Sequence, residues 1–299
     1  MRAFAHALMP SAVWPGWSVA LVPLAALGLA ASGVVTHASS AWFLALGALA
    51  GLPHGALDAL AVQRLLRPRF GRMWTLPFVS GYLGFGAIVV GGWLVTPMAA
   101  LALLLVVGAW HFGTEMVRVG AKDRALRVWV LGLAPIVAPA LLWPLAMQNA
   151  FAPLVGGGAA RVALALAGPV ALVWSAAAIA MLARPGPGHV ELIATLVIFV
   201  ALPPLPAFAV YFAGLHGPRA LGAIARTERR PLGALWAEAM PWALAGGTML
   251  IIGFLLLRPS MPEADALDRA VFIGLSSLAA PHIALGAWLN GEFGRRRPA

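Results

Sequence analysis

Four of the seven histidines lie inside apolar segments, at similar distances from the basic residues that follow those segments. The basic run that follows each segment begins ten, seven, ten and thirteen residues after the histidine, which is roughly 10–20 Å along a helix. Polar groups at membrane depth are costly and usually face the interior of a helix bundle. Because neutral imidazole is the commonest protein ligand for transition metals, the pattern predicts one shared metal site. The four candidate ligands are His54, His111, His216 and His282.

Two carboxylates lie one helical turn after two of these histidines. Asp58 follows His54 by four residues, and Glu115 follows His111 by four. Residues at this spacing share one face of a helix. A carboxylate so placed can orient a ligating imidazole, on its own helix or on another, or can bind the metal itself.

Arg219, three residues after His216, is a cation at predicted membrane depth. A buried charge of this kind needs an anion, and we expect Asp58 or Glu115 to provide it. Glycine and proline flank the four histidines, and irregular backbone inside a membrane is tolerated where it lines a cavity. We therefore expect space for an ion and a substrate beside the histidines.

Other catalytic motifs are absent from the sequence. It contains no Walker-type glycine loop, no His-Glu-x-x-His helix, no Gly-x-Ser-x-Gly elbow and no repeated histidine boxes of the membrane desaturase type. With no cysteine, thiolate ligands are excluded, and a single imidazole per helix favours a mononuclear centre. The other three histidines, His6, His37 and His189, fall before or between the apolar segments.

The elements that position these residues must be membrane-spanning helices. The chain is 62% hydrophobic and 10% charged, with a mean hydropathy of +0.90, too apolar for a compact water-soluble globule of 299 residues. Its apolar stretches are long enough to cross a bilayer as helices. We predict an all-α transmembrane bundle of about ten spans, at 17–35, 41–63, 73–95, 98–118, 124–146, 160–183, 189–204, 206–225, 235–257 and 266–290.

The net charge of +10 suggests membrane topology and not a nucleic-acid partner, because the basic residues stand in short runs between spans. Every run follows an even-numbered span, and Arg258 is the exception. We therefore expect a multi-pass protein of the bacterial inner membrane with both termini cytoplasmic. The runs are Arg64, Arg67, Arg69 and Arg72; Arg118, Lys122, Arg124 and Arg127; Arg184; Arg226, Arg229 and Arg230; and Arg295, Arg296 and Arg297.

No soluble domain fits between the spans. The connection at 148–158 is among the longest, and its Gly156, Gly157 and Gly158 read as a flexible external turn. We therefore predict an N-terminal cytoplasmic segment at 1–16, one transmembrane domain at 17–290 and a basic cytoplasmic tail at 291–299.

The segments that carry the histidines resemble the signature blocks of one membrane family, the Brp/Blh-type β-carotene 15,15'-dioxygenases found beside microbial rhodopsins. The similarity extends from about residue 45 to 290. The resemblance implies an enzyme that uses Fe(2+) and dioxygen to cleave a carotenoid at its central double bond, giving two molecules of retinal. The matching segments are 51–58 (GLPHGALD), 110–115 (WHFGTE), 211–219 (YFAGLHGPR) and 280–283 (APHI).

In this family the iron ligands and catalytic residues map onto His54, His111 and His216. The family typically has a second histidine four residues after the third ligand, where this chain has Ala220. Trp143 also stands where a histidine is often found. The difference at Ala220 leaves an open three-histidine site, or a site completed by His282, or a member with altered or lost catalysis.

A carotenoid is long, rigid and insoluble in water, so we expect it to enter sideways from the lipid into an apolar tunnel. Aromatic residues beside the histidines are the candidates for holding the polyene, while Asp58, Glu115 and Arg219 would tune the ligands. The predicted substrate-binding residues are Trp110, Phe112, Tyr211 and Phe212.

Three other functions are compatible with the residues. A proton-coupled transporter can also line a relay with buried ionisable groups. Histidine pairs can serve as axial ligands of haem, which a Soret band would reveal. The third alternative is a relative that binds a carotenoid or retinal without cleaving it, and the alanine at position 220 is the main observation in its favour.

Overall fold

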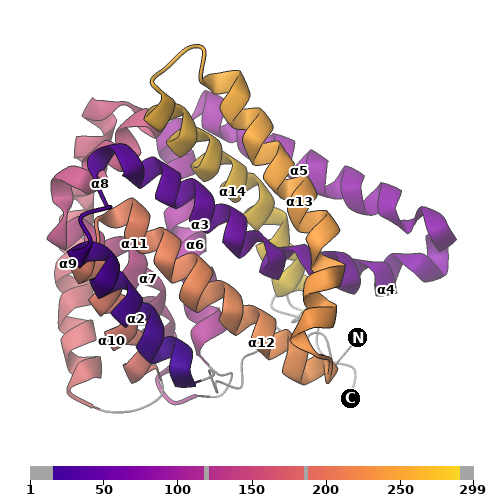
Figure 1. Ribbon diagram of the computed structural model, residues 1–299, viewed down its shortest axis with the longest axis horizontal. Coiled ribbons are helices and arrows are strands. Elements are labelled where there is room, and N and C mark those ends of the chain that lie inside the picture. The colour runs from indigo at the N-terminus through magenta and orange to yellow at the C-terminus, as the bar shows by residue number, and fades with distance from the viewer. Residues whose placement is uncertain (1–15, 118–120, 185–187, 290–299) are drawn as a thin grey trace.

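The computed structural model describes residues 16–117, 121–184 and 188–289, and these residues form helices joined by turns (Figure 1). The predicted all-α class is confirmed. Most of the predicted N-terminal segment, the tail at 291–299, Arg118 and the last basic run lie outside the described residues. The elements are α2 (Gly16–Ala31), α3 (His37–Ala56), α4 (Asp58–Phe70), η1 (Gly71–Trp74), α5 (Thr75–Val95), α6 (Pro97–Met116), α7 (Arg124–Leu142), α8 (Pro144–Val155), α9 (Gly157–Leu182), α10 (His189–Ala201), α11 (Pro204–Val210), η2 (Tyr211–His216), α12 (Gly217–Glu228), α13 (Leu232–Leu257) and α14 (Glu263–Leu289).

Within the described residues, six helical segments are long and apolar enough to cross a membrane. One of them, Ser39–Val95, covers two of the predicted spans, and the shorter apolar helices Val19–Ala31 and His189–Ala201 match two more. The chain is therefore a polytopic membrane protein, and the ten predicted spans are an approximate count. The other five segments are α6, α7, α9, α13 and α14.

The connection predicted at 148–158 is largely helical, contrary to the sequence-based expectation. Most of it is the helix α8, which begins at Pro144 and packs Met147, Phe151 and Leu154 into a buried cluster. A short helix can be stable without spanning the membrane when one face is buried in this way. Of the three glycines, only Gly156 lies between the helices, because α9 begins at Gly157. The φ of Gly156 is 86°, in the left-handed region that favours glycine.

Two predicted spans are interrupted at the site. The span at 41–63 breaks after α3, and α4 begins at Asp58, a few residues after Pro53 inside α3. Proline lacks the amide hydrogen that continues a helical ladder, which favours such a break. The span at 206–225 contains a π-helix, η2, between two α-helices. Single turns of π-helix occur often at functional sites.

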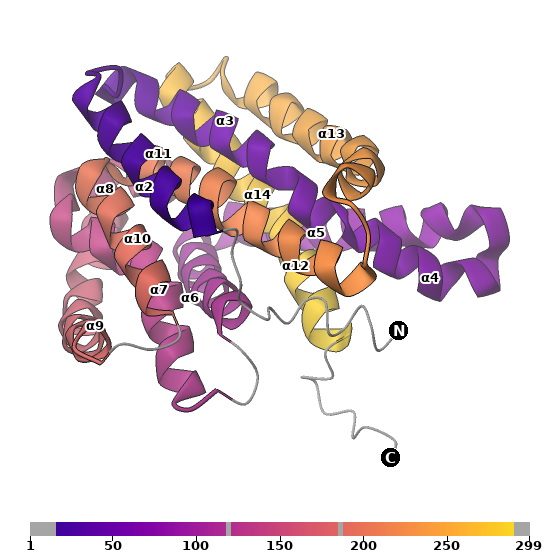
Figure 2. The same ribbon diagram turned by 60° about the horizontal axis from the view of Figure 1, so that its bottom comes forward.

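Close helix contacts determine how the interrupted segments meet. In both views α3 runs beside α11 on one side and beside α13 and α14 on the other (Figures 1 and 2). The helices α6 and α7 cross so closely that a Cβ atom at Gly113 or Gly132 would overlap the backbone of the facing helix. Such contacts between small residues are a common means of packing membrane helices.

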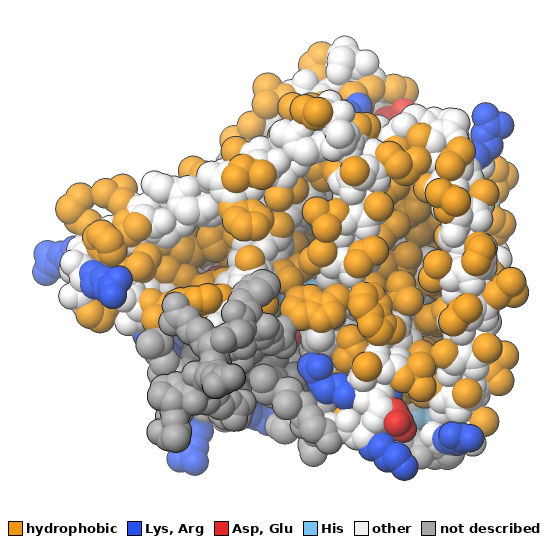
Figure 3. Space-filling view, turned by 180° about the vertical axis from the view of Figure 1, so that it is seen from behind, with side chains coloured by type: hydrophobic (Ala, Val, Ile, Leu, Met, Phe, Trp, Pro, Cys, Tyr) orange, Lys and Arg blue, Asp and Glu red, His pale blue; other side chains and the backbone are white. Residues whose placement is uncertain are grey.

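Apolar side chains are spread over the face of the bundle seen in Figure 3. Ile88, Leu94 and Leu172 are each more than 70% exposed, as expected of side chains that face lipid. Basic side chains gather along the lower edge and at the end of the projecting α4–α5 pair. Arg161, in the first turn of α9, joins Arg258 as an exception to the even-span rule.

Candidate metal centre

His54 occupies the last turn of α3 and is 6% exposed. Its Nδ1 lies 2.5 Å from the backbone oxygen of Gly51. Since a carbonyl oxygen only accepts, Nδ1 donates the hydrogen bond and Nε2 keeps a free lone pair. This tautomer leaves Nε2 available as a ligand atom.

His111 and Glu115 lie on one face of α6, as their spacing predicted. The Nε2 of His111 is 3.6 Å from Glu115 Oε1, and the other carboxylate oxygen is 3.4 Å from Nδ1 of His216. Glu115 therefore stands between histidines from two helices. The carboxylate can orient either imidazole or add an oxygen ligand to a cation.

His216 ends the π-helix η2 and is 1% exposed. Its ring stacks on Phe212 with a centroid distance of 5.5 Å and meets Phe112 edge-on at 4.8 Å. The Nε2 atom is buried and has no hydrogen-bond partner among the described residues. A buried polar nitrogen without a partner is unusual in folded proteins, and a bound metal ion would satisfy it.

His282 lies in the C-terminal third of α14, directly after Pro281. Its Nδ1 is 3.0 Å from Asp58 Oδ1 and 2.9 Å from Oδ2. The hydroxyl of Tyr82 on α5 donates a hydrogen bond to the same carboxylate. Asp58 thus orients a histidine across helices, and not the histidine one turn before it, because α3 breaks between Asp58 and His54.

The structure brings the four predicted histidines together. Neighbouring ring centroids are separated by 4.9 Å from His54 to His216, 5.5 Å from His216 to His111, 5.2 Å from His111 to His282 and 5.7 Å from His282 to His54. The four imidazoles therefore form a closed ring.

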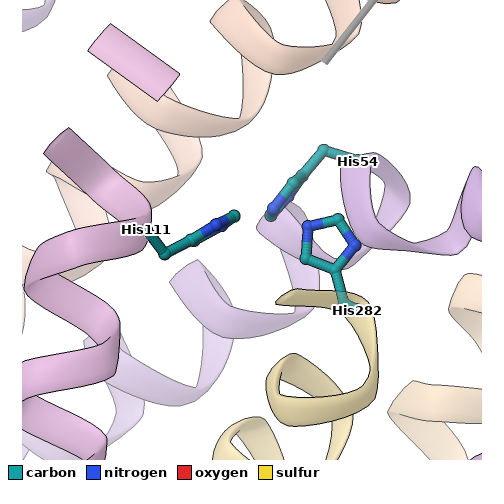
Figure 4. A group of neighbouring side chains, drawn as sticks. All are labelled: His54, His111 and His282. Atoms are coloured by element: carbon teal, nitrogen blue, oxygen red, sulfur yellow. The ribbon is translucent and has the colours of Figure 1, made fainter. Parts of the chain in front are cut away.

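The ligand atoms of this ring approach one another closely enough to share an ion. Those of His54, His111 and His282 all lie within 4.8 Å of one another, and the three side chains converge from three helices (Figure 4). The same limit holds for a second group, His111, Glu115 and His216. Because His111 belongs to both groups, the two describe one continuous cluster of nitrogen and oxygen donors.

The ion-pair partner of Arg219 is Glu191, and not Asp58 or Glu115 as predicted, although Glu115 lies close enough to attract Arg219 electrostatically. Arg219 is 4% exposed, pairs with Glu191 Oε1 at 3.1 Å and donates to the backbone oxygen of Met116 at 3.0 Å. Glu191 was missed, although it is the single carboxylate in the apolar segment at 189–204. The pair joins α12 to α10, and a contact between two separate helices cannot be inferred from local spacing.

Three of the four predicted aromatic residues contact the histidines. Phe112 and Phe212 pack on His216, as described above, and Phe212 also meets His54 at 5.4 Å. Tyr211 stacks on His216 at 6.3 Å, and its hydroxyl is buried with no hydrogen-bond partner among the described residues. Trp110 packs against the hydrophobic core around α7 and α10.

The two positions that depart from the resembled family have separate places in the fold. Ala220 lies on α12, beside Arg219. Trp143 follows α7 and donates its ring N–H to the backbone oxygen of Phe199 at 2.9 Å, which is a structural contact between helices.

A protein-family profile described as "Beta-carotene 15,15'-dioxygenase" matches residues 45–290, which include all four histidines of the ring. The chain belongs to this family. The resemblance noted in the sequence is thereby confirmed, and at the level of its family the chain is a carotenoid-cleaving dioxygenase.

Two curated relatives are similar over most of their length. The "Probable beta-carotene 15,15'-dioxygenase Blh" of Halobacterium salinarum is 27% identical over an alignment that covers 93% of this chain and 90% of the relative. The "Beta-carotene 15,15'-dioxygenase" of an uncultured marine bacterium, 66A03, is 25% identical over 81% of this chain and 90% of the relative. No solved structure matches the chain significantly.

Proposed function

We propose that the histidine ring binds one ferrous ion and that the enzyme uses dioxygen there to cleave β-carotene at its central 15,15' double bond, giving two molecules of retinal. The observation that carries this proposal is the convergence of His54, His111, His216 and His282 in a chain of this family. The names of both curated relatives support the same substrate and bond.

The residues present fit a ferrous ion. Imidazole and carboxylate ligands suit non-haem iron, whereas the chain offers no thiolate. The Nε2 of His216 is buried without a hydrogen-bond partner among the described residues, and Nε2 of His54 has a free lone pair. Glu115 offers a carboxylate to the same site, and an anionic ligand would favour a divalent cation among otherwise neutral ligands.

A ferrous ion held by these residues would supply the activation of dioxygen. In the overall reaction the central carbon–carbon double bond breaks and each carbon receives one oxygen atom, so no external reductant is consumed. The protein's contribution is to hold the ligands and exclude water. Gly51 and Asp58 fix the tautomers of His54 and His282.

The apolar side of the site is suited to a polyene. Phe112, Tyr211 and Phe212 surround His216 with aromatic rings, which pack well against a flat conjugated chain and leave little room for water. Lipid-facing side chains cover the bundle outside, so a carotenoid dissolved in the bilayer can reach the protein without crossing water.

The orientation follows from the charge pattern. We propose that the chain lies in the bacterial inner membrane with both termini in the cytoplasm, because the basic runs follow the even-numbered spans. Reporter fusions after residues 156 and 229 test this topology, and we expect them to report opposite sides of the membrane.

Expression in a bacterium that accumulates β-carotene tests the function. Chromatography of the extracts should show retinal with the wild type and not with His111→Ala, while His189→Ala, a histidine outside the ring, should match the wild type. The purified wild type should contain about one iron per chain. Persistence of β-carotene beside a folded protein, or a Soret band from bound haem, would contradict the proposal.

A further inference from the structure

We propose that Tyr82 and Asp58 act together as a positioning pair that fixes the tautomer and orientation of His282, presenting its Nε2 to the other imidazoles of the ring. The inference rests on the proposed metal function of the ring and adds Tyr82, a residue that no sequence pattern singled out. It also gives Asp58 the role of orienting His282.

The contacts among these three residues join three helices. Asp58 begins α4, Tyr82 lies on α5 and His282 lies on α14. Asp58 and His282 are 5% and 8% exposed, so the carboxylate is shielded from water and must be satisfied by protein groups. The His282 imidazole and the Tyr82 hydroxyl provide two hydrogen bonds to it.

The direction of these bonds determines the ligand atom. An ionised carboxylate only accepts hydrogen bonds, so both Tyr82 and the Nδ1 of His282 act as donors. With the proton on Nδ1, the Nε2 of His282 carries the free lone pair that a metal requires. Carboxylates that accept from ligating histidines in this way orient the ring and raise its basicity.

The surroundings of Asp58 and Tyr82 hold the pair in place. Asp58 lies in the first turn of α4, directly after the break that follows α3. Tyr82 packs against Phe78 with a centroid distance of 4.9 Å, and Phe78 in turn meets Trp242 on α13 at 5.1 Å. The Tyr82 ring is therefore held within an aromatic cluster and its hydroxyl is directed to Asp58.

The test compares metal binding in two variants that keep side-chain shape, Asp58→Asn and Tyr82→Phe. Each protein is purified whole in detergent and titrated with Co²⁺ against a competing chelator, while visible absorption of the bound cobalt reports the ligand geometry. Loss of a group that orients a ligand typically lowers metal affinity by about 10–100-fold. We expect Asp58→Asn to fall in that range, and Tyr82→Phe to lower affinity by several-fold and change the absorption spectrum.

Ser276→Ala is the matched control. Ser276 accepts a hydrogen bond from Trp93 Nε1 at 2.8 Å, so it also joins α5 to α14 through buried side chains, but it does not contact the ring. We expect this variant to lose stability while binding Co²⁺ with the affinity and spectrum of the wild type. If it loses affinity as much as Tyr82→Phe does, general loosening of the two helices explains the result and the positioning role is refuted.

The experiment distinguishes failure of the positioning role from failure of the proposed metal site. If the wild type binds one ion and both shape-preserving variants bind it equally well with unchanged spectra, the positioning pair is refuted and the metal site stands. If the wild type binds no Co²⁺ or Fe²⁺, the metal site is refuted and the positioning role with it.

Discussion

The close crossing of α6 and α7 predicts that Gly113→Ala damages the metal centre without removing any group from it. Gly113 lies between His111 and Glu115 on α6, and its backbone packs directly on α7 at Val128. A methyl group at this position would overlap the Val128 carbonyl oxygen and lie 2.7 Å from the carbonyl carbon. The obstructing atoms belong to a helix backbone, which cannot rotate away as a side chain can.

The size of the displacement follows from these contacts. Ordinary contacts of a Cβ atom begin at 3.4 Å, so the carbonyl carbon alone requires a separation of about 0.7 Å and the nearer oxygen requires more. Overpacking of this kind costs about 1–3 kcal/mol of stability. Metal ligands tolerate errors of only about 0.2 Å, so a shift of α6 carries both His111 and Glu115 out of position. Since a misplacement of ~1 Å can cost about 100-fold in rate, we expect retinal formation to fall 10–100-fold.

The assay measures retinal in the β-carotene-accumulating host, normalised to the folded protein recovered by size-exclusion chromatography, together with iron per chain. Gly108→Ala is the control on the same helix, because its added methyl group would meet only the ring of Phe112, at an ordinary 3.9 Å. We expect Gly108→Ala to retain iron and activity. A Gly113→Ala protein with wild-type iron content and retinal formation would refute the argument that this close approach positions the site.

Two further predictions concern ion pairs. Arg219→Met should lower the free energy of unfolding in mixed detergent micelles by about 3–5 kcal/mol, because it leaves Glu191 buried without its cation. Adding Glu191→Leu should restore much of this loss, and a double variant as unstable as the single one would show that the charge is not the cause. Arg64 holds Glu228 with two hydrogen bonds, of 2.8 and 2.6 Å, so Arg64→Gln should cost about 0.5–1 kcal/mol at neutral pH, a small value because Arg64 is partly exposed. These bonds hold the pKa of the Glu228 carboxyl below its usual 4.5. The stability difference between the wild type and Arg64→Gln should therefore be complete above pH 4.5 and vanish as the pH falls through the lowered pKa. A stability difference that does not change with pH would contradict this origin.

The sequence was sufficient to predict the membrane helices and the principal residues of the ring. A bilayer imposes a minimum length and an apolar composition on every span, so spans are visible in local composition alone. Histidine at membrane depth is costly enough to be conspicuous, and the similar depths of His54, His111, His216 and His282 correctly indicated that they meet. The pairing of Glu115 with His111 was also predictable, because it lies within one helix.

The partners of the other ionisable groups depend on which helices are neighbours. Asp58 contacts His282 from 224 residues away, and Tyr82 and Glu191 enter the surroundings of the site from α5 and α10. Spans that are apolar on all sides carry no periodic signal that would indicate which face meets which helix. The break after α3, the π-helix that ends at His216 and the glycine contacts between α6 and α7 set those relations, so the pairings around the ring emerge only when the whole bundle is packed.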